Sequence, residues 1–378
     1  MNVAVVRNRS RDGVIARHGK PSPETYGRKS VQRVLDALRA GGHRVACLEA
    51  DMTMLAELET LLPPDPLDGG PTGIVLNMGY GIQGECRYTH VPAMLEMAGI
   101  PYTGATPLGH AVSLDKVVAK VLMRDAGVPT PAFTVMSGPG EPLGDLRLPL
   151  VVKPRHESTS YGLQLVRTRP ALDAAVAATV SVYGQAALVE EYVDGRELCV
   201  GLLGNDPPVA LPPVELDFSG RAVRMVTFDD KYHRTFDEPG KLCPAPLDAE
   251  LRAEVEAVAV ATFRACHCRD YARVDIRLDA DGRPFVLEIN SMASLGAGGS
   301  FVRAAEVAGL TFGALVNRIV GLAWERSRAT AVAPAPPVQL QGSVYSLEVE
   351  RARIASRTPS LTPSPESPMP PNGVSSVR

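Results

Sequence analysis

The sequence has little of several features that mark particular classes of protein. Six cysteines in 378 residues are too few for a disulfide framework, and a formal net charge of −3 disfavours nucleic acid or an anionic membrane surface as a partner. The chain contains no run of about 18 apolar residues, which a membrane-spanning helix needs. It shows no apolar signal region behind a basic start. These absences predict a protein of the reducing cytoplasm with neither nucleic acid nor a membrane as its partner.

Cysteine spacing gives one candidate metal motif, Cys266-His267-Cys268. The spacing is too tight for a standard tetrahedral zinc site, and no second CxxC or HxxxH pair accompanies it. We therefore expect buried or inert cysteines here.

The apolar pattern indicates an α/β protein. Apolar residues make up 45% of the chain, an ordinary share for a globular protein, and the length predicts two or three domains. Short apolar runs at residues 3–6, 45–48 and 74–76 alternate with a helical pattern at 30–39, which predicts a parallel sheet. From residue 331 onward Pro and Ser dominate, a composition that predicts a disordered tail.

A literal GxGxxG motif at residues 79–84 follows the third apolar run. A dinucleotide site would need a helix directly after the motif and an acid about 20 residues further on. The residues that follow do not have a helical pattern, and Gly104-Ala105-Thr106 supplies no acid. We therefore interpret the motif as a flexible substrate loop rather than as a nicotinamide site.

Residues 270–290 have the pattern of a β-hairpin, with Asp281-Gly282 as the turn pair. Asp275 and Glu288 are equally far from this turn, so they should face each other with Cβ atoms ~4.5–5.5 Å apart. Two carboxylates this close repel by about 3 kcal/mol at an effective dielectric constant near 20. A bound Mg²⁺ would offset the repulsion. The alternative is that Arg273 and Arg277 form salt bridges with the acids.

Two lysines stand where phosphate could bind. Lys116 falls in the first turn of a helix that Ser113 should cap, where a nearby anion would offset the unfavourable dipole. Lys153 ends an apolar strand at 150–154 and leads into a loop at 155–162 with small hydroxyl residues and a glycine, whose backbone N–H groups could approach phosphate oxygens. A surface lysine and an ordinary polar loop remain the alternatives.

Two further segments could complete a nucleotide site. Glu190 and Glu191 end a predicted strand and could line an adenine and ribose pocket, although a solvated hairpin explains them equally well. The irregular segment from Phe228 to Pro246 is a candidate lid.

Together, the Asp-Lys helix start, the Val-Lys-Pro strand with its loop, and the Arg-Val-Asp … Leu-Glu-Ile-Asn hairpin resemble the ATP-grasp enzymes, and among them the D-alanine–D-alanine ligases. The similarity covers residues 70–325 well and residues 1–50 loosely. It implies a three-domain α/β architecture. The expected parts are an N-terminal parallel α/β substrate domain, a central α+β domain, a C-terminal α+β domain with the metal site, and a disordered Pro/Ser-rich tail, at residues 1–112, 113–204, 205–328 and 329–378.

The resemblance implies a role for each matching residue. The ATP-binding positions comprise phosphate-binding lysines and hydroxyls, adenine-binding residues, a ribose-binding acid and a lid lysine: Lys116, Lys153, Thr159, Ser160, Glu190, Glu191, Val193, Glu197 and Lys231. The ligands of Mg²⁺, for which Mn²⁺ is an alternative, are Asp275, Glu288 and Asn290. The residues expected to act on the reacting groups are Arg273, Lys231, Tyr232 and Ser160, with Arg273 stabilising the tetrahedral species.

The implied activity is ATP-dependent ligation of a small carboxylic acid to a small amine. Attack of the acid on the γ-phosphate gives an acyl-phosphate, a much better acyl donor, and phosphoryl transfer needs positioning and charge neutralisation rather than a protein nucleophile. An amine then attacks, and a cation offsets the oxyanion charge. The resemblance also implies a homodimer.

The chain departs from the family pattern on the substrate side. Asn77-Met78 replace a histidine after the third strand, and Glu24 only approximately matches the family's N-terminal acid. Gly299 stands where the family has a serine for the acceptor carboxylate, with Ser300 one residue later. We therefore expect a product other than D-alanyl-D-alanine. True D-alanine–D-alanine ligation and a non-catalytic ATP-binding regulator are the alternatives.

Overall fold

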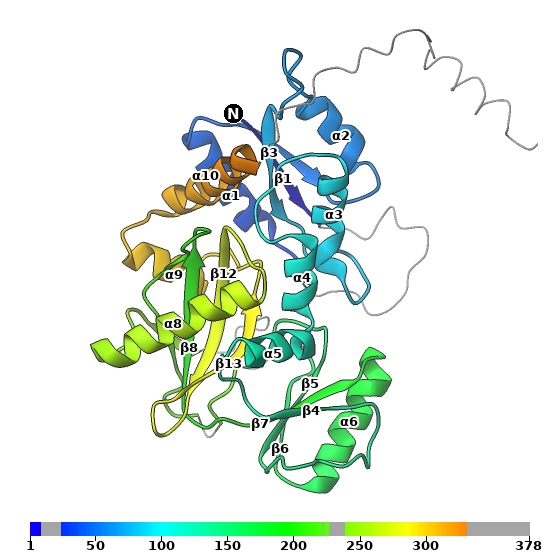
Figure 1. Cartoon of the computed structure of the whole chain (residues 1–378), viewed down its shortest axis with the longest axis vertical. Coiled ribbons are helices and arrows are strands. Elements are labelled where there is room, and N and C mark those ends of the chain that lie inside the picture. Colours follow the sequence, from blue (N-terminus) through cyan, green and yellow to red (C-terminus); the bar gives the residue numbers. More distant parts are fainter. Residues whose placement is uncertain (9–23, 222, 227–238, 331–378) are drawn as a thin grey trace, which may run out of the picture. The chain divides into compact units, whose positions relative to one another are not determined.

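A computed structural model describes residues 1–8, 24–221, 223–226 and 239–330. The predicted lid residues Lys231 and Tyr232, and the predicted tail from residue 331, lie outside the described residues. The described strands form three sheets with helices packed against them, which confirms the mixed α/β class (Figure 1). The domain boundaries expected from the resemblance stay a prediction.

The first sheet has the order β2-β1-β3 and is parallel, as the alternation of strands and helices predicted. Its strands are β1 (Asn2–Arg7), β2 (Arg44–Glu49) and β3 (Gly73–Met78). Between the first two lies α1 (Arg28–Ala40), which buries Val31, Val34, Leu35 and Leu38 at helical spacing. Helix α2 (Met54–Leu61) follows β2.

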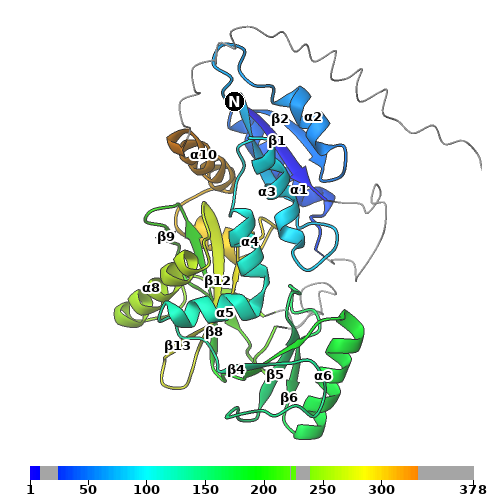
Figure 2. The same cartoon turned by 45° about the vertical axis from the view of Figure 1, so that its right-hand side comes forward.

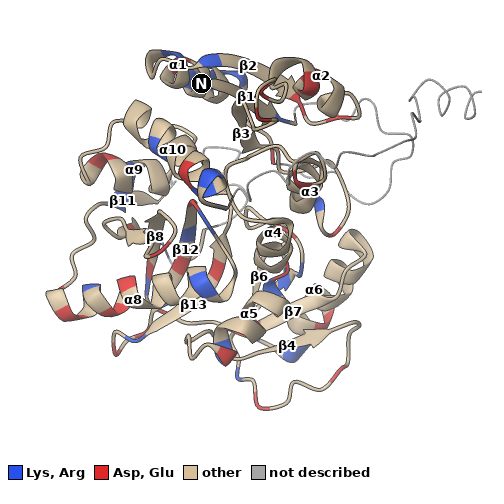
Figure 3. Ribbon diagram, turned by 45° about the horizontal axis from the view of Figure 1, so that its top comes forward, with Lys and Arg blue, Asp and Glu red and all other residues tan. Residues whose placement is uncertain are grey.

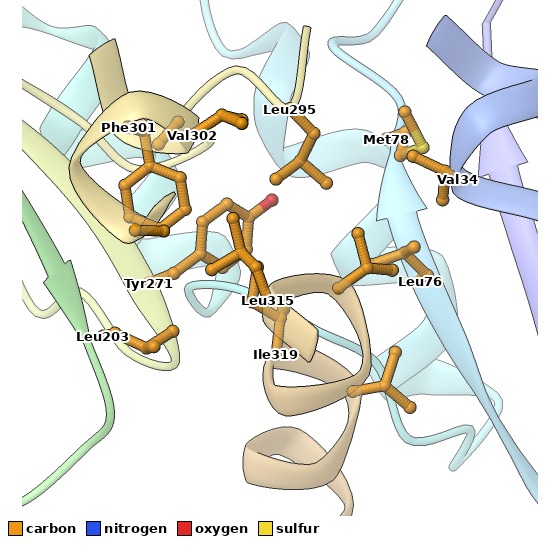
Figure 4. Close-up of a cluster of buried hydrophobic side chains, with 14 of the residues drawn as sticks. Val34, Leu76, Met78, Leu203, Tyr271, Leu295, Phe301, Val302, Leu315 and Ile319 are labelled. Carbon is orange, nitrogen blue, oxygen red and sulfur yellow. The ribbon is translucent and has the colours of Figure 1, made fainter. Parts of the chain in front are cut away.

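The C-terminal helix α10 (Phe312–Thr330) packs beside α1, although the two are far apart in the sequence (Figure 1). Leu315 and Ile319 of α10 share one hydrophobic cluster with Val34, Leu76 and residues of the third sheet, as Figure 4 shows. This cluster joins the N-terminal sheet to the C-terminal half of the described chain.

The second sheet is antiparallel and has the order β4-β7-β5-β6. It consists of β4 (Phe133–Met136), β5 (Leu150–Pro154), β6 (Gln164–Val166) and β7 (Ala187–Glu191). Helix α6 (Arg169–Tyr183) covers one face, where Leu172 and Val176 pack on Leu150 and Val152. The opposite face is left for polar groups of the pocket described below.

The third sheet is built around β8 (Arg196–Leu203), with the strand order β11-β10-β8-β12-β13 and β9 also paired to β8. The other strands are β9 (Val209–Ala210), β10 (Val214–Asp217), β11 (Gly240–Leu242), β12 (Tyr271–Leu278) and β13 (Pro284–Asn290). Helix α8 (Ala249–Ala265) packs on one face of this sheet, and α9 (Ser300–Val307) contacts β8.

The hairpin β12–β13 pairs Asp275 directly with Glu288, as the sequence predicted. The turn is looser than a two-residue turn, because Leu278 pairs with Pro284 and residues 279–283 form the loop. A register shift between Asp275 and Ile276 compensates for the odd loop length, since a β-bulge places one extra residue on one strand.

The connection between the first two sheets contains η1 (Arg87–Thr89), α3 (His90–Met97), α4 (Pro107–Leu114) and α5 (Lys116–Asp125). Figure 2 shows α5 beside α8, and buried Ala119 and Met123 share a cluster with Val255. Bends and a turn occupy residues 82–86, so only two residues separate the GxGxxG motif from η1, which runs directly into α3. The expectation that residues 85–90 are not helical was therefore wrong from Arg87 onward.

One capping prediction was wrong. Ser113 belongs to α4, where its hydroxyl donates to Gly109 O at 2.7 Å, and Asp115 is the N-cap of α5. Asp115 Oδ1 accepts from the backbone N–H groups of Val117 and Val118 at 3.0 and 3.2 Å. The acid is the better cap because its charge also favours the positive end of the helix dipole, which the following lysine opposes.

Within the described residues, no single helix has the length and apolar character to cross a membrane. The pair Ser300–Val307 and Phe312–Ala329 passes that test only in combination, with a bend of 100° between the helices.

Candidate active site

A cavity of about 560 Å³ has walls from the second and third sheets. It is lined by most of the residues that the sequence picked out, namely Lys116, Lys153, Ser160, Glu190, Glu191, Val193, Glu197, Arg273, Asp275, Glu288, Gly299 and Ser300. Figure 3 shows charges of both signs on the inner strands of this part of the chain. Thr159, Asn290 and Glu24 do not line the cavity directly.

A buried carboxylate lies between two lysines at one side of the cavity. Glu190, at the end of β7, is 2.5 Å from Lys153 Nζ and 2.9 Å from Lys120 Nζ. Burial opposes ionisation of Glu190, but the two ammonium groups outweigh that effect and leave its pKa lowered. Burial lowers the pKa of Lys120 to about 8. This triad fixes Lys153 at the strand end with its charge facing the cavity.

Lys116 reaches the same cavity from the first turn of α5. Its ammonium donates to Glu157 O and lies 3.5 Å from Glu288 Oε2. Burial lowers the pKa of Lys116, only partly opposed by Glu288. The Lys116 ammonium therefore lies between the loop at residues 155–162, called the Ser/Thr loop below, and the hairpin β12–β13. These are the two segments that a triphosphate would bridge.

The loop at residues 155–162 has unusual backbone geometry. Thr159 and Ser160 both have φ of 60°, and Gly162 has φ of 77°. Left-handed backbone is strained for a β-branched residue such as threonine. Such strain is found at ligand-binding sites and persists only where the surroundings hold it.

One wall of the cavity is formed by the end of β7 and the residues that follow it. Glu191 Oε1 accepts from Arg147 N at 2.9 Å, so this acid binds backbone across the sheet edge. Val193 O accepts from Arg277 Nη1 at 2.9 Å, and Arg277 Nη2 donates to Glu197 at 2.8 Å. Arg277 thereby fixes the segment expected to hold adenine and ribose.

The two hairpin acids have protein cations as partners. Arg273 donates to both oxygens of Asp275 at 2.7 Å, and Asn290 Nδ2 donates to Asp275 Oδ2 at 3.1 Å. Asp275 outweighs the effect of burial and raises the pKa of Arg273. The salt-bridge alternative therefore holds for Arg273 but not for Arg277, which pairs with Glu197.

The same oxygens suit a hard divalent cation. Asp275 and Glu288 face each other across the ladder and both line the cavity, and Asn290 adds an amide next to Asp275. Oxygen-only donors are those that Mg²⁺ and Mn²⁺ prefer. The described residues contain no group of three or more His, Cys, Asp or Glu arranged for a metal, so the fit rests on two acids and an amide. Cys266 and Cys268, the two cysteines of the candidate metal motif, are buried free thiols.

The predicted substrate residues lie in two places. Gly299 is the N-cap of α9 and Ser300 its first residue, so both present a helix N-terminus at the cavity wall. Glu24 lies outside that wall, buried against Tyr88, whose hydroxyl donates to it, and against Arg87 at 3.5 Å. A stack of Tyr26 on Tyr80 adjoins this acid.

Three residues of this site were missed by sequence reasoning. Lys120 could have been found, because it lies four residues after Lys116 and hence on the same helix face. Asp115 was visible as a better cap than Ser113. Arg87 had no local signal, because its partners are 63 to 71 residues distant in the sequence on either side of it.

Acid titration should separate Asp115 from the other carboxylates. Burial alone would raise its pKa, but bonds from His156, Arg155 and the helix N-terminus hold that pKa well below the usual range. A carboxyl whose folded-state pKa is depressed stabilises the fold above its unfolded pKa, near 3.8, and loses that contribution as the pH falls further. The wild-type protein should therefore lose more unfolding free energy between about pH 5 and pH 2 than Asp115→Asn.

Urea denaturation at each pH measures this difference. Asp173→Asn is the comparison variant, because Asp173 is only partly exposed and its lowered pKa comes from bonds to Gly140 and Arg169 away from the cavity. Equal pH dependence in the wild type and Asp115→Asn would contradict the assignment.

These sheets, with the loop at residues 155–162 and the acid-bearing hairpin lining one cavity, have the arrangement of an ATP-grasp ligase, a class that forms carbon–nitrogen bonds. A family model described as D-ala D-ala ligase C-terminus matches residues 122–321. The chain belongs to the D-alanine–D-alanine ligase family.

Individual relatives support the same family. A D-alanine–D-alanine ligase of Syntrophobacter fumaroxidans is 38% identical over 240 residues, which are 62% of this chain and 76% of that protein. The uncharacterized protein y4sG of Sinorhizobium fredii is 49% identical over 330 residues, which are 86% of this chain and 98% of that protein. The crystal structure of the Bacillus anthracis D-alanine–D-alanine ligase complexed with ATP shares the fold, with a TM-score of 0.65, 21% identity, and coverage of 88% of this chain and 100% of that one.

Proposed function

We propose that the protein is an ATP- and Mg²⁺-dependent ligase that joins an amino acid or related acid to an amine, with a product other than D-alanyl-D-alanine. The observation that carries this proposal is the cavity in which Lys116, Lys153 and Ser160 face Asp275 and Glu288. Cations for a triphosphate on one side and oxygen ligands for a divalent ion on the other are the requirements of phosphoryl transfer.

The residues act mainly by positioning and by charge. Lys116 and Lys153 bind phosphate oxygens, and the backbone of Thr159 and Ser160 adds N–H donors at the same end. Asp275, Glu288 and Asn290 would hold Mg²⁺, which would supply positive charge against the triphosphate. Outside the described residues, Lys231 and Tyr232 are proposed to close over the reaction.

Amide formation follows in the same cavity. The activated acid lies near Arg273, whose guanidinium is held by Asp275 and stabilises the oxyanion that forms when the amine attacks. The N-terminus of α9, from Gly299 and Ser300, binds the acceptor's carboxylate through backbone N–H groups. Glycine at 299 supplies no hydroxyl, which supports an acceptor other than D-alanine.

The relatives named D-alanine–D-alanine ligase favour a second candidate, true D-alanine–D-alanine ligation. The six free cysteines support a reducing cytoplasm as the place of either activity. A homodimer is proposed from the family alone.

A coupled ADP-release screen over amino acids of both hands, alone and in pairs, distinguishes the candidates. We expect ADP release with at least one pair that is not two molecules of D-alanine, with the ligated product identified by mass spectrometry. ADP release with D-alanine alone would establish the second candidate instead. Mg-ATP binding without ADP release across the panel would contradict both.

A further inference from the structure

Arg87 is a buried arginine that the proposed chemistry does not use. Its guanidinium comes from η1, in the segment that connects the first sheet to α4, and has only 4% of its side chain exposed. It lies 3.5 Å from carboxylates on two different segments, Glu24 and Glu157. A single buried cation therefore balances two acids.

The same guanidinium donates hydrogen bonds to the strained Ser/Thr loop. Arg87 Nη1 donates to His156 O at 3.0 Å, and Nη2 to Ser158 Oγ at 3.4 Å. These contacts immediately precede Thr159 and Ser160, whose φ values of 60° are unfavourable for side-chain-bearing residues. Strained backbone of this kind is unfavourable and persists only where surrounding contacts hold it.

Other anchors hold the start of the loop but not the hydroxyl of Ser158. Arg155 pairs with Asp115 at 2.7 Å, and His156 N donates to Gln185 Oε1 at 2.9 Å. The partners in these two anchors are Asp115, the N-cap of α5, and Gln185, between α6 and β7. Two neighbouring residues join the loop to Glu24: Arg87, and Tyr88, whose side chain is hydrogen-bonded to both Ser158 and Glu24.

Tyr88 reinforces the link to Glu24. Burial raises the pKa of Tyr88 well above its ordinary value, so the side chain stays a hydroxyl that donates to Glu24. The Arg87 guanidinium lies over the Tyr88 ring, 5.4 Å from its centroid. Glu24, Tyr88, Arg87 and the loop thus form one continuous buried polar network.

We infer that Arg87 is a positioning residue that couples the charge at Glu24 to the phosphate affinity of the Ser/Thr loop. Among the described residues, Arg87 is shared between the acids Glu24 and Glu157. Neutralising Glu24 would therefore leave Glu157 as the acidic partner of Arg87 in this part of the chain and strengthen the bonds of Arg87 to the loop. An ammonium group arriving at Glu24 would act in this way. The inference rests on the proposed function, which assigns the loop to ATP phosphates, and it adds that Glu24 receives the ammonium group of a substrate.

Calorimetric titration of Mg-ATP tests the first half of this inference. Arg87→Lys keeps the positive charge, but an ammonium lacks the planar guanidinium that donates hydrogen bonds to His156 O and Ser158 Oγ at once. The Kd for Mg-ATP should therefore rise about tenfold. Arg326→Lys is the matched control, since Arg326 is largely buried and bonds Asp270 and Tyr102 O away from the cavity. Its Kd should stay within about twofold of wild type even if its Tm falls.

A double-mutant cycle tests the coupling itself. Glu24→Gln should lower the Kd for Mg-ATP about threefold in the wild-type background and leave it unchanged in Arg87→Met. A long-range charge effect of Glu24 would instead persist in both backgrounds. Ser158→Ala replaces Arg87→Met if that variant does not fold, and should reduce the Glu24→Gln effect in the same way.

The outcomes separate this inference from the proposed function. Wild-type protein that binds no Mg-ATP would overturn both. The inference alone would be overturned if the wild type binds Mg-ATP and Arg87→Lys has the same Kd. It would also be overturned if Glu24→Gln changes the Kd by the same factor with and without Arg87.

Discussion

Substituting Lys153 or Glu288 with Ala should abolish ADP release with every substrate pair that the wild-type protein accepts. Lys153 stands at the end of β5 with its ammonium in the cavity, and Glu288 faces Asp275 across the hairpin. Under the proposed function each variant removes a charge that would offset the triphosphate or hold its metal, and loss of one such preorganised group costs about 10²–10³ in rate. Steady-state ADP release at saturating Mg-ATP measures the effect.

Two exposed residues give matched controls for these variants. Lys29→Ala in α1 and Glu254→Ala in α8 make the same changes on solvated helix surfaces and should retain full activity. Melting temperatures must accompany the rates, because Lys153→Ala also leaves Glu190 with Lys120 as its remaining lysine partner. Full activity of either cavity variant would refute the site.

Arg273→Lys should lower kcat by about a hundredfold and change the Kd for Mg-ATP by no more than about threefold. The guanidinium is fixed by two 2.7 Å bonds to Asp275, a geometry that an ammonium cannot reproduce. Because the proposed role is at the oxyanion, the loss should appear in the rate of amide formation rather than in nucleotide binding. Single-turnover product formation and calorimetry measure the two quantities separately.

Arg283→Lys is the matched control for this prediction, since Arg283 lies in the loop of the same hairpin with 71% of its side chain exposed. Its activity should equal that of the wild type. A large rise in the Kd for Mg-ATP with unchanged kcat in Arg273→Lys would move Arg273 from oxyanion stabilisation to nucleotide binding.

Local patterns of the sequence predicted much of the site, because many of its residues sit at fixed positions in regular elements. Side-chain alternation placed Asp275 opposite Glu288, and the structure pairs them. The turn itself was predicted less well, since a five-residue loop and a bulge give the same pairing as a two-residue turn. The strand that ends at Lys153 and the apolar face of α1 were likewise readable from period and composition.

The sequence by itself determined the types of element, the facing acids and the family to which the chain belongs, because these depend on spacing along the backbone. Only the tertiary structure decided which charges meet. Arg273 pairs with Asp275 while Arg277 turns to Glu197, Lys120 shares Glu190 with Lys153, and Arg87 joins Glu24 to the Ser/Thr loop. Except for Arg273 with Asp275, these partners come from separate strands or helices, and packing of the sheets brings them within bonding distance in a medium where unpaired charge is costly.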